Sequence, residues 1–181
     1  MYLWGGRSLT MGRKMRIVKL IDKISEWTGA LSAWIVIPLM LVVMYEVAMR
    51  HFFNDPTAWG YDVSWMLFSA QFLLGGAFTH LRKGHIRIDI VYGTLSERAK
   101  LIYDFLINLI IIMPPMILFG WAGINFAAMA YSTGEKLSTT NWFFPAGPPK
   151  TLIPVGFFLL ALQCLAEIVR SYQKLKKGGP P

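Results

Sequence analysis

The sequence predicts an all-α membrane protein with four transmembrane helices. Hydrophobic residues make up 55% of its 181 residues. They are gathered in four long blocks, and these blocks lack the period-two alternation of strands. We expect the spans at about 27–50, 60–81, 102–131 and 151–170. A helix rises about 1.5 Å per residue, so such stretches can cross a hydrocarbon core about 30 Å thick.

The chain divides into one membrane domain and two tails. Residues 1–16 are expected to form a basic, flexible N-terminal tail, and residues 175–181 a flexible C-terminal tail. Residues 17–174 then form a single four-helix membrane domain.

The segment 17–27 precedes the first span and carries charges on an otherwise apolar helical pattern. The charged residues are Lys19, Asp22, Lys23 and Glu26. This pattern predicts an amphipathic N-terminal helix at the cytoplasmic surface, which can run straight into the first span. A basic segment before an apolar one is also typical of a signal peptide. The length of the apolar block and its lack of a small-residue cleavage site favour a retained helix.

The connection between spans two and three is the one intracellular connection, and it is long enough to have a structure of its own. Its residues 94–97 fit a capping box, which predicts a helix that starts there and runs into the third span. Upstream, polar His85, Arg87 and Asp89 alternate with apolar residues. A lone strand beside a bilayer has no partner, so we expect an interfacial helical or extended connection and treat these three residues as a candidate cytoplasmic motif.

The third and fourth spans each have an irregular feature. The third is longer than a perpendicular crossing needs, and Pro114-Pro115 within it predicts a kink. The fourth is short unless Ile168 and Val169 are added beyond Glu167, whose carboxylate would then face protein or the membrane interface.

The positive charges set the orientation. Lys and Arg are concentrated in the two tails and in the connection between spans two and three. The other two connections hold three of the 18 cations, namely Arg50, Lys136 and Lys150. The positive-inside rule therefore places both termini in the cytoplasm. Since the cations flank apolar spans, their expected partners are anionic phospholipids and not nucleic acid.

The intramembrane polar residues are sparse and suit helix packing. They are Gln71, Asn108, Asn125, Gln163 and Glu167. We expect them to form hydrogen bonds between helices, with close approach at Gly75, Gly76, Gly120, Gly123 and Ala127. Cys164, the only cysteine, is expected to be a small packing residue, and we expect no metal or cofactor on this chain.

Three charged residues border the connection between the first two spans. Glu46 and Arg50 are one helical turn apart, in the favourable order for an ion pair. Asp62 lies near the start of the second helix, where a carboxylate is stabilised by free backbone N–H groups. They are predicted to form a network that closes the hairpin. The alternative is that they are water-exposed flanking charges.

The connection between spans three and four is unusually aromatic. Trp142, Phe143 and Phe144 lie in a stretch too short to span and too apolar for a free loop. The segment should lie at the outer interface. Two interpretations remain open, an ordinary aromatic belt or a docking surface for a partner.

These motifs resemble a known family. The matching residues are Glu46, Arg50, Phe53-Asn54, Pro56, Trp59, Asp62, Gly84-His85-Ile86 and Ile88-Asp89. With the four-span layout, they resemble the small membrane subunit of tripartite ATP-independent periplasmic (TRAP) transporters, the DctQ-like family. Asp62 stands where many members carry Glu, which shortens its reach to Arg50.

The resemblance implies a multi-pass subunit of a bacterial inner membrane, with a scaffold role and no enzymatic activity. A large multi-span subunit would hold the substrate and sodium sites, and a periplasmic binding protein would deliver an organic acid. The chain itself has neither an inverted repeat nor a pair of broken helices of the kind that builds an ion site.

Two other functions are compatible with a small helical membrane protein. A self-contained proton-coupled exporter could use Glu46, but this residue lies towards one end of its span. A membrane anchor of a respiratory enzyme would need facing haem ligands. His51 and His80 fall at opposite ends of their spans, about a membrane thickness apart.

Overall fold

The computed structural model describes residues 5–82, 96–138 and 141–176. In this part of the chain the structure is helical, apart from one isolated antiparallel bridge between Lys136 and Pro145. The elements are α1 (Gly5–Phe52), α2 (Gly60–Leu81), α4 (Glu97–Leu106), the π-helix η1 (Ile107–Ile112), α5 (Met113–Ser132) and α6 (Gly147–Lys176). The all-α prediction is confirmed.

The first helix is far longer than the first predicted span. α1 runs for 48 residues without a break, so the amphipathic segment and the first span form one helix. It also includes most of the segment 1–16, for which the sequence predicts a flexible tail.

Three stretches of the described chain are long and apolar enough to cross a membrane. They are Met15–Phe52, Arg98–Thr133 and Gly147–Lys176. α2 does not meet this criterion, although its 22 residues coincide with the second predicted span. Polar residues within it, such as Gln71 and His80, lower its hydropathy.

The two prolines for which the sequence predicts a kink directly follow a change of helix type, and the kink itself stays a prediction. Proline has no N–H to continue the α-helical hydrogen bonds, and the turns just before the two prolines form the π-helix η1. The N–H of Met113 accordingly donates to the carbonyl of Asn108, five residues back. α4, η1 and α5 follow one another directly from Glu97 to Ser132.

The helix that leads into this stretch starts later than the capping box predicts. Ser96, not Thr94, is the N-cap of α4, and its hydroxyl accepts a hydrogen bond from the N–H of Ala99 at 3.3 Å. Thr94 itself and the candidate motif of His85, Arg87 and Asp89 lie outside the described residues.

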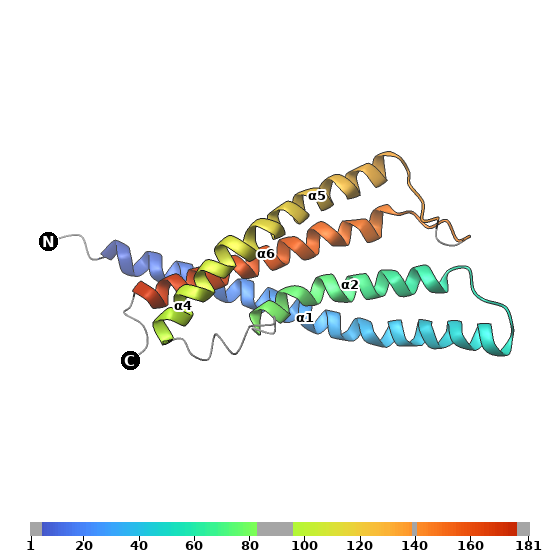
Figure 1. Cartoon of the computed structure of the whole chain (residues 1–181), viewed down its shortest axis with the longest axis horizontal. Helices are drawn as coiled ribbons and strands as arrows, with labels where there is room; N and C mark the ends of the chain where they lie inside the picture. Colours follow the sequence, from blue (N-terminus) through green and yellow to red (C-terminus); the bar gives the residue numbers. More distant parts are fainter. Residues whose placement is uncertain (1–4, 83–95, 139–140, 177–181) are drawn as a thin grey trace.

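The helices form an open row instead of a closed bundle. α1 packs against α2, α2 against α6, and α6 against α5, while α1 also reaches α6 (Figure 1). Both termini lie at one end, which we call the terminal end. The connection 53–59 and the described parts of the α5–α6 connection, 133–138 and 141–146, lie at the opposite end, the loop end (Figure 1).

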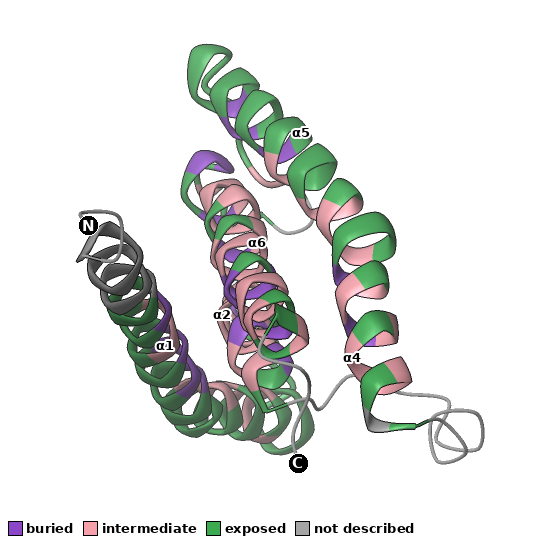
Figure 2. Cartoon of the chain, turned by 90° about the vertical axis from the view of Figure 1, so that its left-hand side faces the viewer, coloured by how far each residue is buried: buried purple, intermediate pink, exposed green. Residues whose placement is uncertain are grey.

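The core is thin and made of small residues. Buried positions are frequent on α6, near the middle of the row, whereas α1 and α5 are largely exposed (Figure 2). Ala77, Cys164 and Ala166 are among the buried apolar residues. Small side chains let helices approach closely, which is how helices associate in membranes.

Glycines mark the closest approaches. A Cβ on Gly75 would lie 2.9 Å from Ser32 Oγ, and one on Gly123 would lie 2.9 Å from Ile153, as expected for close-packing glycines. Gly76 has open space instead. The tightest approach among the described glycines was not predicted: a Cβ on Gly29 of α1 would lie 2.4 Å from the ring of Phe78 on α2.

Candidate functional site

The α1–α2 connection at the loop end is organised around the carboxylate of Glu46. Arg50 Nη2 lies 2.9 Å from Glu46 Oε1, one turn along α1. The side chain of Arg50 is 68% exposed, whereas that of Glu46 is 13% exposed. The acid is therefore enclosed by the hairpin, and the guanidinium covers it from the solvent side.

Thr57 holds the second oxygen of the same carboxylate. Its backbone N–H donates to Glu46 Oε2 at 3.2 Å, and its hydroxyl donates to the same oxygen. The hydroxyl oxygen of Thr57 in turn accepts the N–H of Gly60 at 3.1 Å, at the first residue of α2. A Cβ on Gly60 would lie 2.6 Å from both Glu46 Oε2 and Thr57 Oγ1, so a side chain at this position would displace the hydrogen-bonded pair.

The third predicted member, Asp62, is buried. It is 3% exposed, in the first turn of α2. The alternative that Asp62 is a water-exposed flanking charge is therefore wrong. Pairing between Asp62 and Arg50 stays a prediction. We call Glu46, Arg50, Thr57, Gly60 and Asp62 the hairpin cluster.

The α5–α6 connection is held by backbone and ionic contacts. The N–H of Leu137 donates to the carbonyl of Phe144 at 2.8 Å, and that of Ala146 donates to Glu135 at 2.8 Å. Lys150 Nζ lies 2.6 Å from Glu135 Oε2. These contacts give the predicted aromatic stretch a defined shape.

Within that stretch, Trp142 and Phe144 stack with ring centroids 4.7 Å apart. Phe143 lies between them in sequence, is 56% exposed and adopts a φ of 52°. This left-handed conformation is rare for a bulky residue and turns the chain sharply. Whether the aromatic residues form a belt or a docking surface stays a prediction.

An apolar cleft of about 380 Å³ lies between α2, α5 and α6 near the loop end. Trp65, Phe72 and Phe126 are among the residues that line it. Lys150 is the charged residue in the lining, and its ammonium is held by Glu135 and lies 3.8 Å from the centre of the Phe126 ring. The cleft therefore offers an organic anion no unengaged cation.

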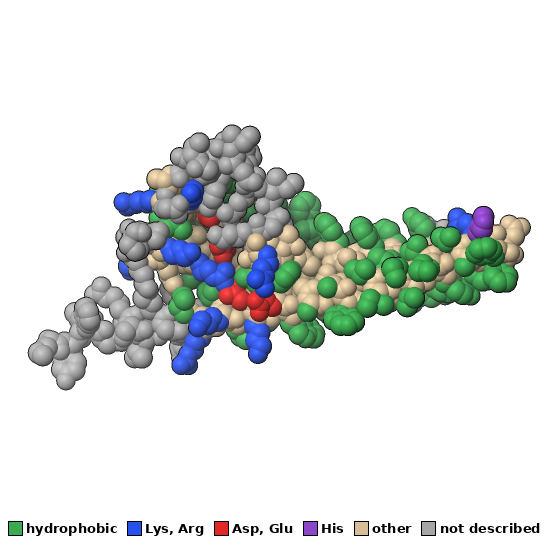
Figure 3. Space-filling view, turned by 90° about the horizontal axis from the view of Figure 1, so that it is seen from below, with side chains coloured by type: hydrophobic (Ala, Val, Ile, Leu, Met, Phe, Trp, Pro, Cys, Tyr) green, Lys and Arg blue, Asp and Glu red, His purple; other side chains and the backbone are tan. Residues whose placement is uncertain are grey.

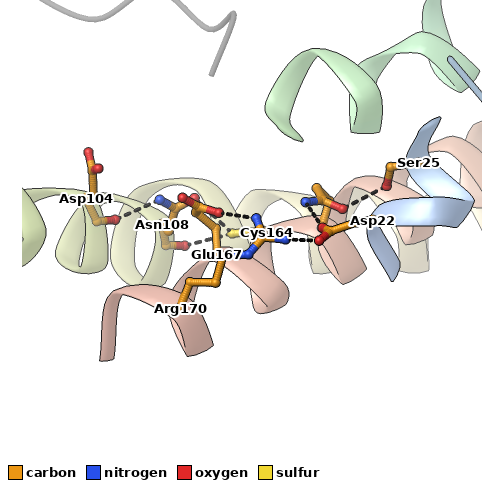
Figure 4. Close-up of polar contacts among 8 residues, drawn as sticks. Asp22, Ser25, Asp104, Asn108, Cys164, Glu167 and Arg170 are labelled. Atoms are coloured by element: carbon orange, nitrogen blue, oxygen red, sulfur yellow. Dashed lines mark hydrogen bonds and ion pairs between the residues drawn. The ribbon is translucent and has the colours of Figure 1, made fainter. Parts of the chain in front are cut away.

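A second polar group, absent from the predicted site, joins α1 to α6 near the terminal end (Figure 4). Arg170 of α6 forms an ion pair with Asp22 of α1, and it also pairs with Glu167 at 2.7 Å. The amide of Gln163 donates to Asp22 at 3.2 Å and accepts from the hydroxyl of Ser25 at 2.8 Å. We call Asp22, Ser25, Gln163, Glu167 and Arg170 the polar layer.

Gln163 connects helices through its side chain, as predicted. The side-chain amide of Asn108 instead donates to the carbonyl of Asp104 at 2.7 Å in its own helical stretch, and its Oδ1 accepts the thiol of Cys164 at 3.5 Å. Gln163 is fully buried and bonds two residues of α1. The thiol of Cys164 donates to the carbonyl of Asn108 at 3.2 Å, which joins α6 to η1. That carbonyl also accepts from Met113, so the π-helix supplies the oxygen that the buried thiol uses.

The hairpin cluster and the polar layer are both suited to holding helices together. Glu46, Asp22 and Glu167 each have a cationic, hydroxyl or amide partner within this chain. In the part of the chain that the structure describes, no group of three or more His, Cys, Asp or Glu residues could hold a metal ion.

Comparison with known proteins places the chain among membrane transport subunits. A family profile described as "Tripartite ATP-independent periplasmic transporters, DctQ component" matches residues 39–174. The sialic acid TRAP transporter small permease protein SiaQ of Vibrio cholerae is 25% identical over 71% of this chain and 75% of its own length. A putative TRAP transporter small permease protein of Haemophilus influenzae is 25% identical over 65% of this chain and 69% of its own. The C4-dicarboxylate TRAP transporter small permease protein DctQ of V. cholerae is 27% identical over 49% of this chain and 37% of its own length.

Proposed function

Because the chain belongs to the DctQ component family, the small permease subunits of TRAP transporters, we propose that it is a scaffold which braces a large multi-span subunit while that subunit moves its substrate. This function needs a surface for the large subunit and no transport path in the small one.

The open row of helices is the observation that carries this proposal. Of the 18 most apolar consecutive residues of α1, 6% are buried within the chain. Of the 18 most apolar consecutive residues of the α4–α5 stretch, 11% are buried. A self-contained four-helix transporter would bury one face of every helix against the others. Here two long helices keep most of their apolar surface available to lipid and to another protein.

The polar groups support the same conclusion. Glu46, the residue a proton-coupled exporter would use, is held by Arg50 and Thr57 at one end of α1. The apolar cleft has no cation left for an organic anion, because Lys150 is engaged by Glu135. Substrate and sodium would then be bound by the large subunit.

The proposal includes four crossings of a bacterial inner membrane, with both termini in the cytoplasm. α2, the second helix along the chain, would add a crossing to the three candidate spans, because its 22 residues extend about 33 Å beside α1. The terminal end is rich in Lys and Arg, as Figure 3 displays on one face of the molecule, and these cations would meet anionic phospholipids.

The transported solute would be an organic acid delivered by a periplasmic binding protein. The names of two relatives, a sialic acid and a C4-dicarboxylate transporter protein, support this class of substrate. Coupling to sodium would then occur on the large subunit.

Reconstitution tests whether the large subunit carries out transport and this chain serves as its scaffold. Proteoliposomes would contain the large subunit with this chain, the large subunit alone, or this chain alone, with binding protein and labelled organic acid outside. We expect sodium-dependent uptake from the pair and none from this chain alone. Transport by this chain alone would contradict the scaffold role and favour the exporter. Full uptake by the large subunit alone, at equal yield and stability, would also contradict it.

Arg50→Ala tests whether the hairpin cluster takes part. We expect a lower yield of the two-subunit complex or slower uptake, because the cover over Glu46 is lost. Arg82→Ala, which removes a longer and more exposed pair with Glu26 at 3.7 Å, is the matched control. Unchanged yield and uptake in Arg50→Ala would remove the cluster from the proposal.

A further inference from the structure

The N-terminal half of α1 has an exposed apolar stripe that no described part of the chain covers. Its members are spaced alternately three and four residues apart: Ile17, Leu20, Ile24, Trp27, Leu31 and Trp34. Leu20 is 59%, Trp27 68% and Trp34 69% exposed. Apolar residues at this spacing form the face that a helix presents to a partner helix.

A different face of α1 packs within the chain. Val18, Ser25 and Ser32 are buried at intervals of seven residues, where α1 meets α2 and α6. The stripe is therefore additional to the surface that holds the four-helix row together.

Lipid tails cannot cover the beginning of the stripe. The uncharged stretch Trp27–Tyr45 has 19 residues and a length of about 28 Å, which already fills a hydrocarbon core of about 30 Å. Ile17, Leu20 and Ile24 lie beyond it, among Lys19, Lys23 and Glu26. They would face water if lipid were the partner of α1.

The membrane surface does not suit this segment either. An interfacial helix lies in the plane of the membrane, but α1 continues from Gly5 to Phe52 as one helix with no break near Trp27. Transmembrane helices tilt by up to about 40° from the membrane normal. The start of the stripe therefore extends away from the membrane, along the axis of the helix that crosses it.

The charges beside the stripe indicate the kind of partner. Arg16 and Lys23 are exposed and flank its first members on one side. Two copies of this chain have the same orientation in one membrane, so stripe against stripe would bring both sets of cations together. A partner helix with acidic residues at this level would be attracted instead.

We propose that the stripe from Ile17 to Trp34 is the seat of a helix of the large subunit, one that is apolar through the membrane and acidic where it extends beyond it at the terminal end. This inference rests on the proposed function, and it names the face of α1 that does the bracing. Packing along a seam that continues outside the bilayer would fix the tilt of one subunit against the other.

Site-specific photocross-linking tests the contact in the assembled transporter. Benzoylphenylalanine would replace Leu20 or Ile24 on the stripe, or the exposed Lys19 beside it as the matched control, in membranes that contain both subunits. We expect an adduct with the combined mass of the two subunits from Leu20 and Ile24, several-fold stronger than from Lys19. An adduct with twice the mass of this chain would identify a second copy and overturn the proposal. Lipid adducts without a protein adduct would overturn it as well.

The co-purified yield of the two subunits separates the two levels of the argument. Normal co-purification without stripe cross-links would refute the stripe and leave the scaffold function standing. If the subunits do not co-purify at all, the proposed function fails. Lys23→Glu adds a charge test: we expect a several-fold loss of complex relative to Lys19→Glu, and equal effects of the two variants would contradict the acidic partner.

Discussion

Thr57 shows how one hydroxyl can organise a membrane hairpin. The O–H group donates to Glu46 on α1, and the hydroxyl oxygen accepts from the N–H of Gly60, the first residue of α2. The backbone N–H of the same residue reaches the same carboxylate. An acid at the end of one helix thus fixes the start of the next. Arg50 contributes from the exposed side, where an ion pair contributes less.

Thr57→Val should therefore loosen the hairpin more than Arg50→Ala does. Valine keeps the shape of threonine but loses both hydroxyl hydrogen bonds, and the N–H of Gly60 loses its partner. We expect a fall in Tm on the order of a few degrees for the detergent-purified protein. Thr57→Ser retains the hydroxyl and should restore most of the Tm. A larger effect of Arg50→Ala would contradict this ranking.

The sequence predicted Glu46, Arg50 and Asp62 as members of the hairpin cluster but not Thr57 and Gly60. Glu46 and Arg50 are visible because their four-residue spacing places them together on any helix. The role of Thr57 depends on how the connection folds back, with Asn54 at a φ of 50°, and spacing alone does not encode that geometry. The burial of Asp62 likewise follows from packing and not from its position at a helix start.

At the level of elements, the polar layer ties the ends of the chain together. Asp22 and Arg170 are far apart in the sequence, and each has closer charged neighbours that make it look like part of a solvated face. The sequence therefore predicted Gln163 as a link between helices but not the ion pair beside it. Pro114-Pro115 was a stronger signal, because a missing N–H must alter the helix wherever it lies.

A double-mutant cycle should reveal coupling between Asp22 and Arg170. Arg170→Ala leaves Asp22 and Glu167 without their shared cation. We expect a loss of about 1–3 kcal/mol, less than for a fully buried pair because both side chains are partly exposed. Asp22→Ala should cost less, because Arg170 still pairs with Glu167. Thermal unfolding of the two single variants and the double variant measures the coupling.

The control for this cycle is Lys174→Ala, which removes an exposed cation one turn further along α6. It should leave the Tm nearly unchanged. If the losses of Asp22→Ala and Arg170→Ala simply add in the double variant, the ion pair does not couple α1 to α6.

At the scale of the whole molecule, the sequence could predict the helices but not which of them lie side by side in the open row. Every span is apolar on most of its faces, so hydropathy does not mark which face meets which neighbour. The actual neighbours are set by small residues such as Gly29 and Gly156, which allow close approach to Phe78 and Leu73. In the described part of the chain the helices run back and forth, so the start of α1 and the end of α6 lie at one end (Figure 1).

Labelling of single introduced cysteines tests whether α2 crosses the membrane. The native Cys164 does not interfere, because it is fully buried and bonded to Asn108. Asp55→Cys, Ser138→Cys and Lys174→Cys would report on the two connections and the C-terminal end of α6, all at exposed positions. With four crossings, a membrane-impermeant maleimide labels positions 55 and 138 in intact cells. Position 174 is labelled only after permeabilisation. If α2 stayed on one side, positions 55 and 138 would lie on opposite faces and position 174 would share the face of 55. Each pattern therefore fixes the number of crossings, and an outward-facing position 174 would contradict cytoplasmic termini as well.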